Sequence, residues 1–328
     1  MKCTSKIISL VLTATLLFIT GCGQEKVSLN TPYDVYDMTR TAGIAADTSG
    51  SEKTYFSDSL CVSEDVSIGT DSTDSQVAEG AAAFNLATGS VVYAKNIYKR
   101  LYPASTTKIL TAYIALTHCD NLDAKVTVSE NAVKQASDSS VCNLKAGDIV
   151  TLRDLLYGLM LRSGNDAAIA IAEYISGDVA SFSDLMNEEA LKLGATQTHF
   201  VNPNGLPDEN HYTTVYDMYL LFAKAIENET FVDIISTKSY DAVYTDASGE
   251  TVEHTWENTN QYLTGAAKSP EGFQVIGGKT GTTGEAGYCL VLYSYNASSQ
   301  PIISIVFKAD GKSNLYLLMT EMLQGFAN

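Results

Sequence analysis

Segments typical of β-strands lie near both ends of residues 78–328, and segments typical of helices lie between them. The strand-like segments are short, apolar and bounded by turn residues, and they cover residues 81–86, 90–94, 274–279, 288–295 and 302–307. Because one sheet can collect strands from distant parts of a chain, we expect a single sheet built from the two ends. The predicted fold class is mixed α/β (α+β), with an inserted all-helical region.

The middle of the chain has apolar residues at helical spacing. Helices are predicted for residues 105–118, just after Pro103, for residues 151–162 and 166–175, and near the end for residues 315–326. The two middle helices are separated by Ser163-Gly164-Asn165, which we expect to form a helix-breaking loop.

The N-terminus has the pattern of an export signal. Lys2 and Lys6 precede an apolar run over residues 7–19, and Ile19-Thr20-Gly21-Cys22 follows. Small residues directly before a cysteine resemble the bacterial lipobox, in which that cysteine is lipidated. We therefore expect residues 1–21 to be a lipoprotein signal peptide and Cys22 to be the lipidated mature N-terminus. An ordinary cleaved signal peptide is the alternative.

Residues 22–77 differ in composition from the rest of the chain. They are rich in Ser, Thr, Asp and Gly and show no sustained periodicity. We expect a flexible acidic tether from Cys22, part of which can dock through its few aromatic and aliphatic side chains, and a folded domain over residues 78–328.

Charge and cysteine spacing exclude several classes of function. The formal net charge of −17 opposes binding to nucleic acid, because phosphate backbones are repelled. The cysteines that follow the tether start are scattered and do not have the spacing of a zinc site; they are Cys61, Cys119, Cys142 and Cys289. We expect buried free thiols and no metal.

A serine and a lysine stand one helical turn apart in the first predicted helix. Ser105 and Lys108 are the ends of the sequence STTK, so both side chains project from the same face. A serine hydroxyl needs a base to act as a nucleophile, and a lysine can serve if burial and nearby positive charge lower its pKa. Alone, this pattern occurs about once by chance in a chain of this length.

Two further polar motifs follow in order. Ser163 and Asn165 flank a glycine in the interhelical loop, where they can converge on Ser105. Lys279, Thr280 and Gly281 follow an apolar strand, and such a strand beside the nucleophile can bind a carboxylate and supply N–H groups to an oxyanion hole. Glycine allows one backbone to approach another closely.

The three motifs in this order resemble the SxxK, SxN and KTG set of penicillin-binding proteins and serine β-lactamases. The flanking sequences are similar to those of low-molecular-mass D-alanyl-D-alanine carboxypeptidases of peptidase family S11; they are YPASTTK at 102–108, RSGNDA at 162–167, FVNPNGL at 200–206 and GKTGTTGEAGY at 278–288. The resemblance implies a β-lactamase/transpeptidase-like fold, with a roughly five-stranded antiparallel sheet flanked by helices.

The resemblance also implies a reaction. The terminal D-alanine of peptidoglycan stem pentapeptides would be removed through an acyl-enzyme on Ser105, with Lys108 as base. Ser163 would pass a proton to the leaving amine and Asn165 would orient the substrate. β-Lactams would acylate the same serine. No cofactor is implied, and we expect a monomer attached by its lipid to the outer face of the cytoplasmic membrane.

The remaining implied roles concern the terminal carboxylate and the oxyanion. Lys279 and Thr280 would engage the carboxylate, and the N–H groups of Ser105 and Thr282 would form the oxyanion hole. Relatives often carry an arginine near the carboxylate, where this chain has Tyr216. The chain also ends at Asn328, so we expect an N-terminal lipid in place of the C-terminal anchor of many relatives.

Other functions remain open at this point. A class A β-lactamase would need a deacylating glutamate in an ExxLN-like loop, and none is found between the second and third motifs. An endopeptidase acting on cross-links would share all three motifs. Residues 272–280 resemble a nucleotide-binding P-loop, but Phe273 stands where glycine is needed. A non-enzymatic module that senses β-lactams or cell-wall peptides is the last alternative.

Overall fold

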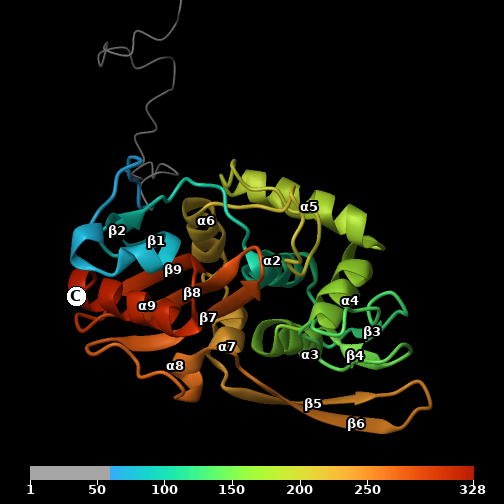
Figure 1. Cartoon of the computed structure of the whole chain (residues 1–328). Coiled ribbons are helices and arrows are strands. Elements are labelled where there is room, and N and C mark those ends of the chain that lie inside the picture. Colours follow the sequence, from blue (N-terminus) through green and yellow to red (C-terminus); the bar gives the residue numbers. More distant parts are fainter. Residues whose placement is uncertain (1–59) are drawn as a thin grey trace, which may run out of the picture. The chain divides into compact units, whose positions relative to one another are not determined.

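The structure is a computed structural model that describes residues 60–328 (Figure 1). The predicted signal peptide, the predicted lipidation site Cys22 and residues 23–59 of the predicted tether lie outside the described residues.

A five-stranded sheet is built from both ends of this region. Its strands are β1 (Ala78–Asn85), β2 (Ser90–Lys95), β7 (Gln274–Thr283), β8 (Gly287–Tyr295) and β9 (Pro301–Ala309). Their order is β2-β1-β9-β8-β7, and every neighbouring pair is antiparallel. The predicted sheet is confirmed, and β7, which carries the KTG residues, is at its edge.

Helices follow the predicted pattern and extend it. They are α2 (Lys108–His118), α3 (Leu152–Tyr157), α4 (Asn165–Ser176), α5 (Val179–Lys192), α6 (Val215–Ala225), α7 (Glu229–Ser236), α8 (Gln261–Thr264) and α9 (Lys312–Phe326). Short polar side chains cap several of them; Thr151 Oγ1, for example, accepts from Asp154 N at 3.0 Å. Because the cap satisfies a free N–H, it fixes where the helix begins.

The helices cover the sheet on both faces. On one face lies α9 (Figure 1), which packs through buried apolar side chains that include Leu315, Met319 and Leu323. On the other face α6 packs on β1 and β9 and also contacts α2. The helix α2 is thereby buried among α4, α5, α6 and α7, which explains its nearly continuous apolar sequence.

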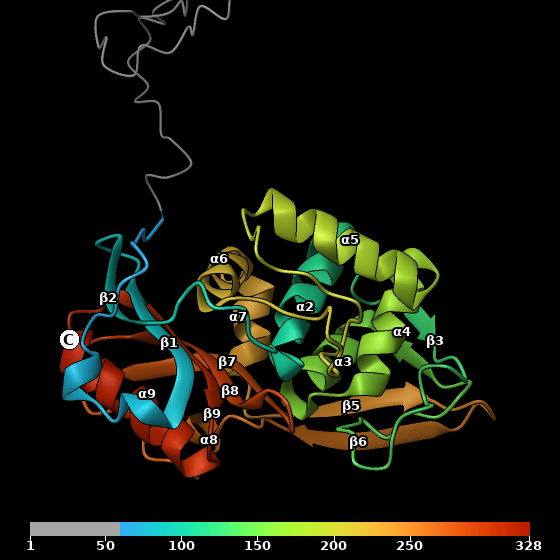
Figure 2. The same cartoon turned by 45° about the horizontal axis from the view of Figure 1, so that its top comes forward.

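A second sheet lies within the region that was predicted to be all-helical. It contains β3 (Lys125–Thr127), β4 (Ile149–Thr151), β5 (Ser239–Thr245) and β6 (Thr251–Glu257), in that order. The ribbon β5–β6 runs beside α3 and extends away from the helices (Figure 2). It was not predicted because most of its side chains are polar and exposed, so no apolar pattern marks it. The inserted region is therefore helical with a small sheet.

Residues 60–77 contact the folded domain, although they belong to the predicted tether. Cys61 is fully buried, and its N–H donates to Tyr219 Oη at 2.9 Å. Ile68 pairs with Ala94 of β2 through two backbone hydrogen bonds of 2.8 and 3.1 Å. The folded part of the chain thus includes residues before β1.

Two searches of residues 60–328 gave negative findings. No helix in this range has the length and apolar character needed to cross a membrane. No group of three or more His, Cys, Asp or Glu side chains in this range is placed to hold a metal ion.

Candidate active site

Ser105 lies where the five-stranded sheet meets the helices. It is the second residue of a 3₁₀ turn, Ala104–Thr107, that leads directly into α2. The edge strand β7 passes close to this turn: a Cβ atom on Gly281 would be 2.9 Å from Ser105 N. Glycine at 281 therefore lets the strand approach the nucleophile, as its place in the motif predicts.

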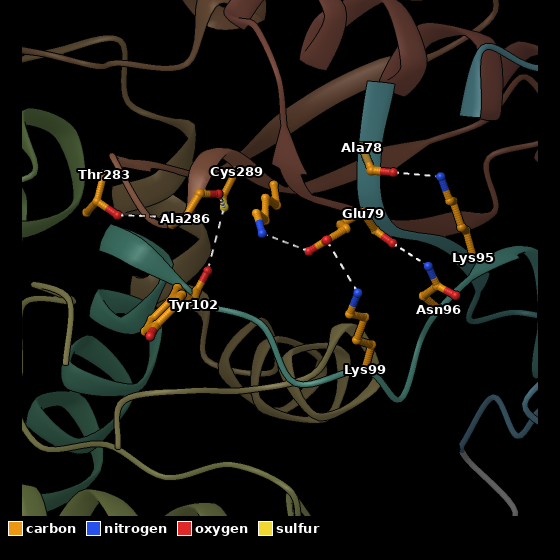
Figure 3. A network of polar contacts seen from close by, with 10 residues as sticks. Ala78, Glu79, Lys95, Asn96, Lys99, Tyr102, Thr283, Ala286 and Cys289 are labelled. Atoms are coloured by element: carbon orange, nitrogen blue, oxygen red, sulfur yellow. Dashed lines mark hydrogen bonds and ion pairs between the residues drawn. The ribbon is translucent and has the colours of Figure 1, made fainter. Parts of the chain in front are cut away.

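The segment before Ser105 is tied to the sheet by several polar contacts (Figure 3). Asn96 Nδ2 donates to Glu79 O at 2.7 Å, and Lys99 Nζ lies 3.3 Å from Glu79 Oε1. Nearer the site, the Cys289 thiol faces the carbonyl oxygens of Ala286 and Tyr102. These contacts hold the segment in place against β1 and β8, and with it the start of the turn.

Lys108 is fully buried beneath Ser105 and has three oxygen neighbours. Its Nζ donates to Ser105 Oγ at 3.1 Å, to Asn165 Oδ1 at 2.8 Å and to Asn204 O at 2.6 Å. Burial, and next the positive charge of Lys279, hold the pKa of Lys108 well below its ordinary value. A lysine in this environment can exist as a neutral amine and act as a base.

A loop over residues 200–206 closes over the lysine. Thr111 Oγ1 donates to Pro203 O at 2.7 Å, which places the neighbouring Asn204 carbonyl on Lys108. His211 joins the same loop to the helix start, because its Nδ1 accepts from Val201 N at 3.1 Å and its Nε2 contacts Thr107 Oγ1 at 2.8 Å. Asn204 was not predicted to belong to the site, because a backbone carbonyl has no sequence signature.

Ser163 and Asn165 stand on opposite sides of Gly164. Ser163 has a φ of 63° and ends a π-helical turn, Gly158–Arg162, and Asn165 begins α4. A Cβ atom on Gly164 would be 2.3 Å from Cys142 Sγ. The close packing of this glycine on the buried thiol fixes the turn, so that both side chains face the region of Ser105.

Lys279 is almost fully buried within β7. Its Nζ donates to Thr280 O at 3.0 Å, and burial lowers its pKa to about 7. The Thr280 hydroxyl lies 2.6 Å from that of Thr259, which holds it toward the cleft. The motif continues within the strand instead of ending it, because β7 extends to Thr283.

Two adjoining pockets open at Ser105. The first, which we call the strand pocket, has a volume of about 200 Å³ and is lined by Ser105, Ser140, Ser163, Thr259, Thr280, Gly281, Thr282, Tyr288, Cys289, Lys312, Leu315 and Tyr316. The second, the loop pocket, is lined by Ser105, Asp138, Ser139, Ser140, Asn165, Asn204, Gly205, Leu206, Pro207, Thr282, Thr283, Gly284 and Glu285. Lys108 and Lys279 are buried behind these walls. The structure thus brings all the predicted site residues of the domain together.

Tyr216 lies elsewhere. Its side chain, on α6, belongs to an aromatic cluster with Phe84, Tyr98 and Tyr219. It lines neither pocket. Its side chain helps to pack α6 on the sheet. The charged side chain that does line the strand pocket is Lys312, which the sequence analysis did not identify.

The family model of D-alanyl-D-alanine carboxypeptidases (peptidase S11) matches residues 68–311. The chain belongs to this family. The match confirms the predicted resemblance to peptidase family S11. The P-loop alternative is also excluded, because most of residues 272–280 form the strand β7 and no helix follows them directly.

Curated proteins that are similar in sequence to this chain carry the name of the same family. The chain is 35% identical over 252 residues to D-alanyl-D-alanine carboxypeptidase DacF of Bacillus subtilis, covering 75% of this chain and 61% of that protein. It is 40% identical over 224 residues to the D-alanyl-D-alanine carboxypeptidase of Streptomyces sp. (strain K15). That match covers 65% of this chain and 75% of that protein. The chain thus spans less than two thirds of the Bacillus relative.

The fold is also that of a solved family member. The crystal structure of the Streptomyces K15 DD-transpeptidase superimposes with a TM-score of 0.71 at 35% identity, covering 77% of this chain and 98% of that one. The crystal structure of D-alanyl-D-alanine carboxypeptidase DacD from Francisella tularensis gives a TM-score of 0.67 at 28% identity. It covers 84% of this chain and 73% of that one. The predicted fold class is confirmed.

Proposed function

We propose that the protein is a serine D-alanyl-D-alanine carboxypeptidase that removes the terminal D-alanine from peptidoglycan stem pentapeptides. The observation that carries this proposal is the set of contacts around Lys108. With a neutral amine, its two N–H groups can donate to Asn165 Oδ1 and Asn204 O, and its lone pair is left to accept the proton of Ser105 Oγ, 3.1 Å away.

In the acylation step, Ser105 Oγ forms a bond to the carbonyl carbon of the penultimate D-alanine and Lys108 takes its proton. The N–H groups of Ser105 and Thr282 stabilise the oxyanion, since helix starts and strand edges present free donors. The C–N bond then breaks. Lys108 gives the proton it took from Ser105 to the amine by way of Ser163 and becomes neutral again, and D-alanine leaves with its carboxylate beside Thr280 and Lys279.

In the deacylation step, water replaces D-alanine. Lys108 takes a proton from the water as the water oxygen bonds to the ester carbon. The bond between that carbon and Ser105 Oγ then breaks, and Lys108 returns the proton to Ser105 Oγ. β-Lactams acylate Ser105 in the same way, but their opened ring stays attached to the acyl group and hinders water.

Peptide hydrolysis and penicillin labelling test this function. The purified protein should release D-alanine from diacetyl-L-lysyl-D-alanyl-D-alanine and should bind a fluorescent penicillin covalently. Ser105→Ala should abolish both, whereas Ser248→Ala, at an exposed turn, should change neither. Labelling of Ser105→Ala at the parent rate would remove Ser105 as nucleophile. Products from intact peptidoglycan separate a carboxypeptidase, which frees D-alanine, from an endopeptidase, which cleaves the cross-links between stem peptides.

We also propose that the protein is a lipoprotein on the outer face of the cytoplasmic membrane. The support is the sequence alone: a basic start, an apolar run and a lipobox-like stretch before Cys22. Mass spectrometry of the mature N-terminus should find a diacylglyceryl group on Cys22, and an unmodified terminus at another residue would contradict the anchor. Size-exclusion chromatography of the delipidated protein should give the mass of a monomer.

A further inference from the structure

An apolar groove beside α6 lies apart from the active site. Its volume is about 450 Å³, and its walls include Leu193 at the end of α5, Leu220, Ala223 and Ile226 on or next to α6, and Tyr293 of β8. We call it the α6 groove. Within residues 60–328, it shares no lining residue with the strand pocket or the loop pocket. The groove is therefore a separate feature that the proposed reaction does not use.

The α6 groove presents almost no net charge. Among residues 60–328, the charged side chains that line it are Lys224 and Glu227, and these two form an ion pair with each other. Because the two charges offset each other, the groove gives little attraction to a charged partner. Apolar and aromatic side chains, in contrast, gain free energy when they leave water for such walls.

The described part of the chain begins at this groove. Leu60, the first described residue, lines the groove and packs partly buried against the main core. Cys61 N donates at 2.9 Å to the hydroxyl oxygen of Tyr219, which also lines the groove, and Tyr98 Oη donates to Ser63 O at 2.5 Å. The residues after Leu60 are thus bound to the domain, and the residues before it start from the wall of the groove.

The sequence places two aromatic residues within reach of the groove. Tyr55 and Phe56 lie outside the described residues, five and four positions before Leu60. An extended chain advances about 3.3 Å per residue, so these residues start within roughly 13–17 Å of Leu60. A segment joined to the groove by so few residues also has a high effective concentration there, which favours it over a separate partner.

We propose that the α6 groove binds the aromatic side chains of Tyr55 and Phe56 of the same chain. The contacts that begin at Leu60 then continue toward the N-terminus, and the tether leaves the domain at α6. This place shares no wall with the pockets at Ser105, so the bound segment does not compete with a peptide for them. The inference does not depend on the proposed function.

Limited digestion of the full-length protein with chymotrypsin tests the proposal, because this protease cuts after Tyr and Phe. Tyr33 and Tyr36 in the same tether serve as internal references. Cleavage after Tyr55 and Phe56 should be about tenfold or more slower than after the two references, since cleavage requires the open form of a bound segment. Mass spectrometry of the products gives the rate at each position.

A groove variant assigns the protection to the groove. Ala223→Arg places a long charged side chain in the groove from a half-buried position on α6. Cleavage after Tyr55 and Phe56 should then become as fast as after Tyr33 and Tyr36. Ala180→Arg is the matched control, because Ala180 is exposed on α5 and lines neither the groove nor the pockets at Ser105. It should keep the protection.

Stability gives a second measurement that leaves the groove itself unchanged. Tyr55→Ser combined with Phe56→Ser should lower the urea concentration at the midpoint of unfolding by about 0.5 M, because two aromatic side chains lose their burial. Tyr33→Ser combined with Tyr36→Ser should leave the midpoint at the parent value. In the Ala223→Arg background, the first pair should have no further effect, as expected for groups that act through one contact.

Three outcomes would overturn the proposal. The first is cleavage after Phe56 as fast as after Tyr36 in the parent, or an unchanged midpoint in the variant of Tyr55 and Phe56. The second is protection that persists in Ala223→Arg, because nearness to the domain would then explain it. The third is protection that increases with protein concentration, which would assign the groove to a second copy of the chain. The midpoint comparison decides the question even if Ala223→Arg does not fold.

Discussion

Gly205 lies so close to Ala104 that a Cβ atom at position 205 would be 1.9 Å from the Ala104 carbonyl oxygen. The same Cβ would be 3.0 Å from Ser105 N, and Gly205 has a φ of 87°, in the left-handed region. The loop that carries the Asn204 carbonyl therefore packs backbone to backbone against the start of the nucleophile turn. The base and the nucleophile are held together by this contact.

Gly205→Ala should slow acylation by penicillin by about tenfold or more, because the loop must move away from Ser105. Gly249→Ala is the matched control, since Gly249 has the same φ of 87° but nothing within 4 Å of its added Cβ. Both variants should lose about 1 kcal/mol of stability from the left-handed backbone, and Gly205→Ala should lose more because its Cβ meets the Ala104 carbonyl. Only Gly205→Ala should lose activity. Equal acylation rates in the two variants would show that the contact does not matter.

Lys108→Ala should fold normally and acylate about 10²-fold or more slowly, the range of general-base catalysis. The acylation rate of the parent should rise with pH through the lowered pKa of Lys108, because only the neutral amine accepts the proton of Ser105. Stopped-flow measurements with a chromogenic cephalosporin between pH 5 and 9 check both points. If Lys108→Ala acylates at the parent rate, or if its acylation rate still rises with pH as in the parent, Lys108 is not the base.

Lys279 should make the stability of the protein depend on pH. Its pKa is about 7 in the folded state, below the ordinary value of 10.5, so the unfolded chain binds more protons between these values. The free energy of unfolding should therefore rise with pH in this window, by about 2 kcal/mol from pH 7 to 9 relative to Lys279→Met. Urea unfolding at several pH values measures this, with exposed Lys125→Met as control. A flat or falling difference would contradict the prediction.

His211 should be required for the position of the loop over Lys108. The ring is buried, with a pKa lowered to about 4 by burial, and it bridges Val201 N and Thr107 Oγ1. His211→Ala leaves both groups without this partner, which should cost about 2 kcal/mol or more. Urea unfolding and the acylation rate should both be affected, whereas His254→Ala on β6 should affect neither. Unchanged stability would show that the bridge is dispensable.

The sequence determined the sheet and predicted the main site residues. The apolar strands at both ends and the helices between them are encoded by local patterns, which require no knowledge of the partners. Ser105, Lys108, Ser163, Asn165, Lys279 and Thr280 were found because their chemistry depends on short spacings within a turn or a strand.

Local patterns did not reveal the second sheet or the packing of Tyr216. The strands β5 and β6 are largely exposed, so burial leaves no trace in their sequence. Tyr216 lies on α6, and its side chain contacts Phe84 and Tyr98. The orientation of a side chain depends on the packing of its helix, which residue order does not specify.

Tertiary structure alone decided which groups share the site. The Asn204 carbonyl reaches Lys108 only because Gly205 packs on Ala104. Lys312, Asp138 and Glu285 come together only because α9, the β7–β8 turn and the loop before β4 end around the same nucleophile. A backbone carbonyl has no sequence signature, and a single exposed charge has no pattern, so both become recognisable only when the chain has folded around them.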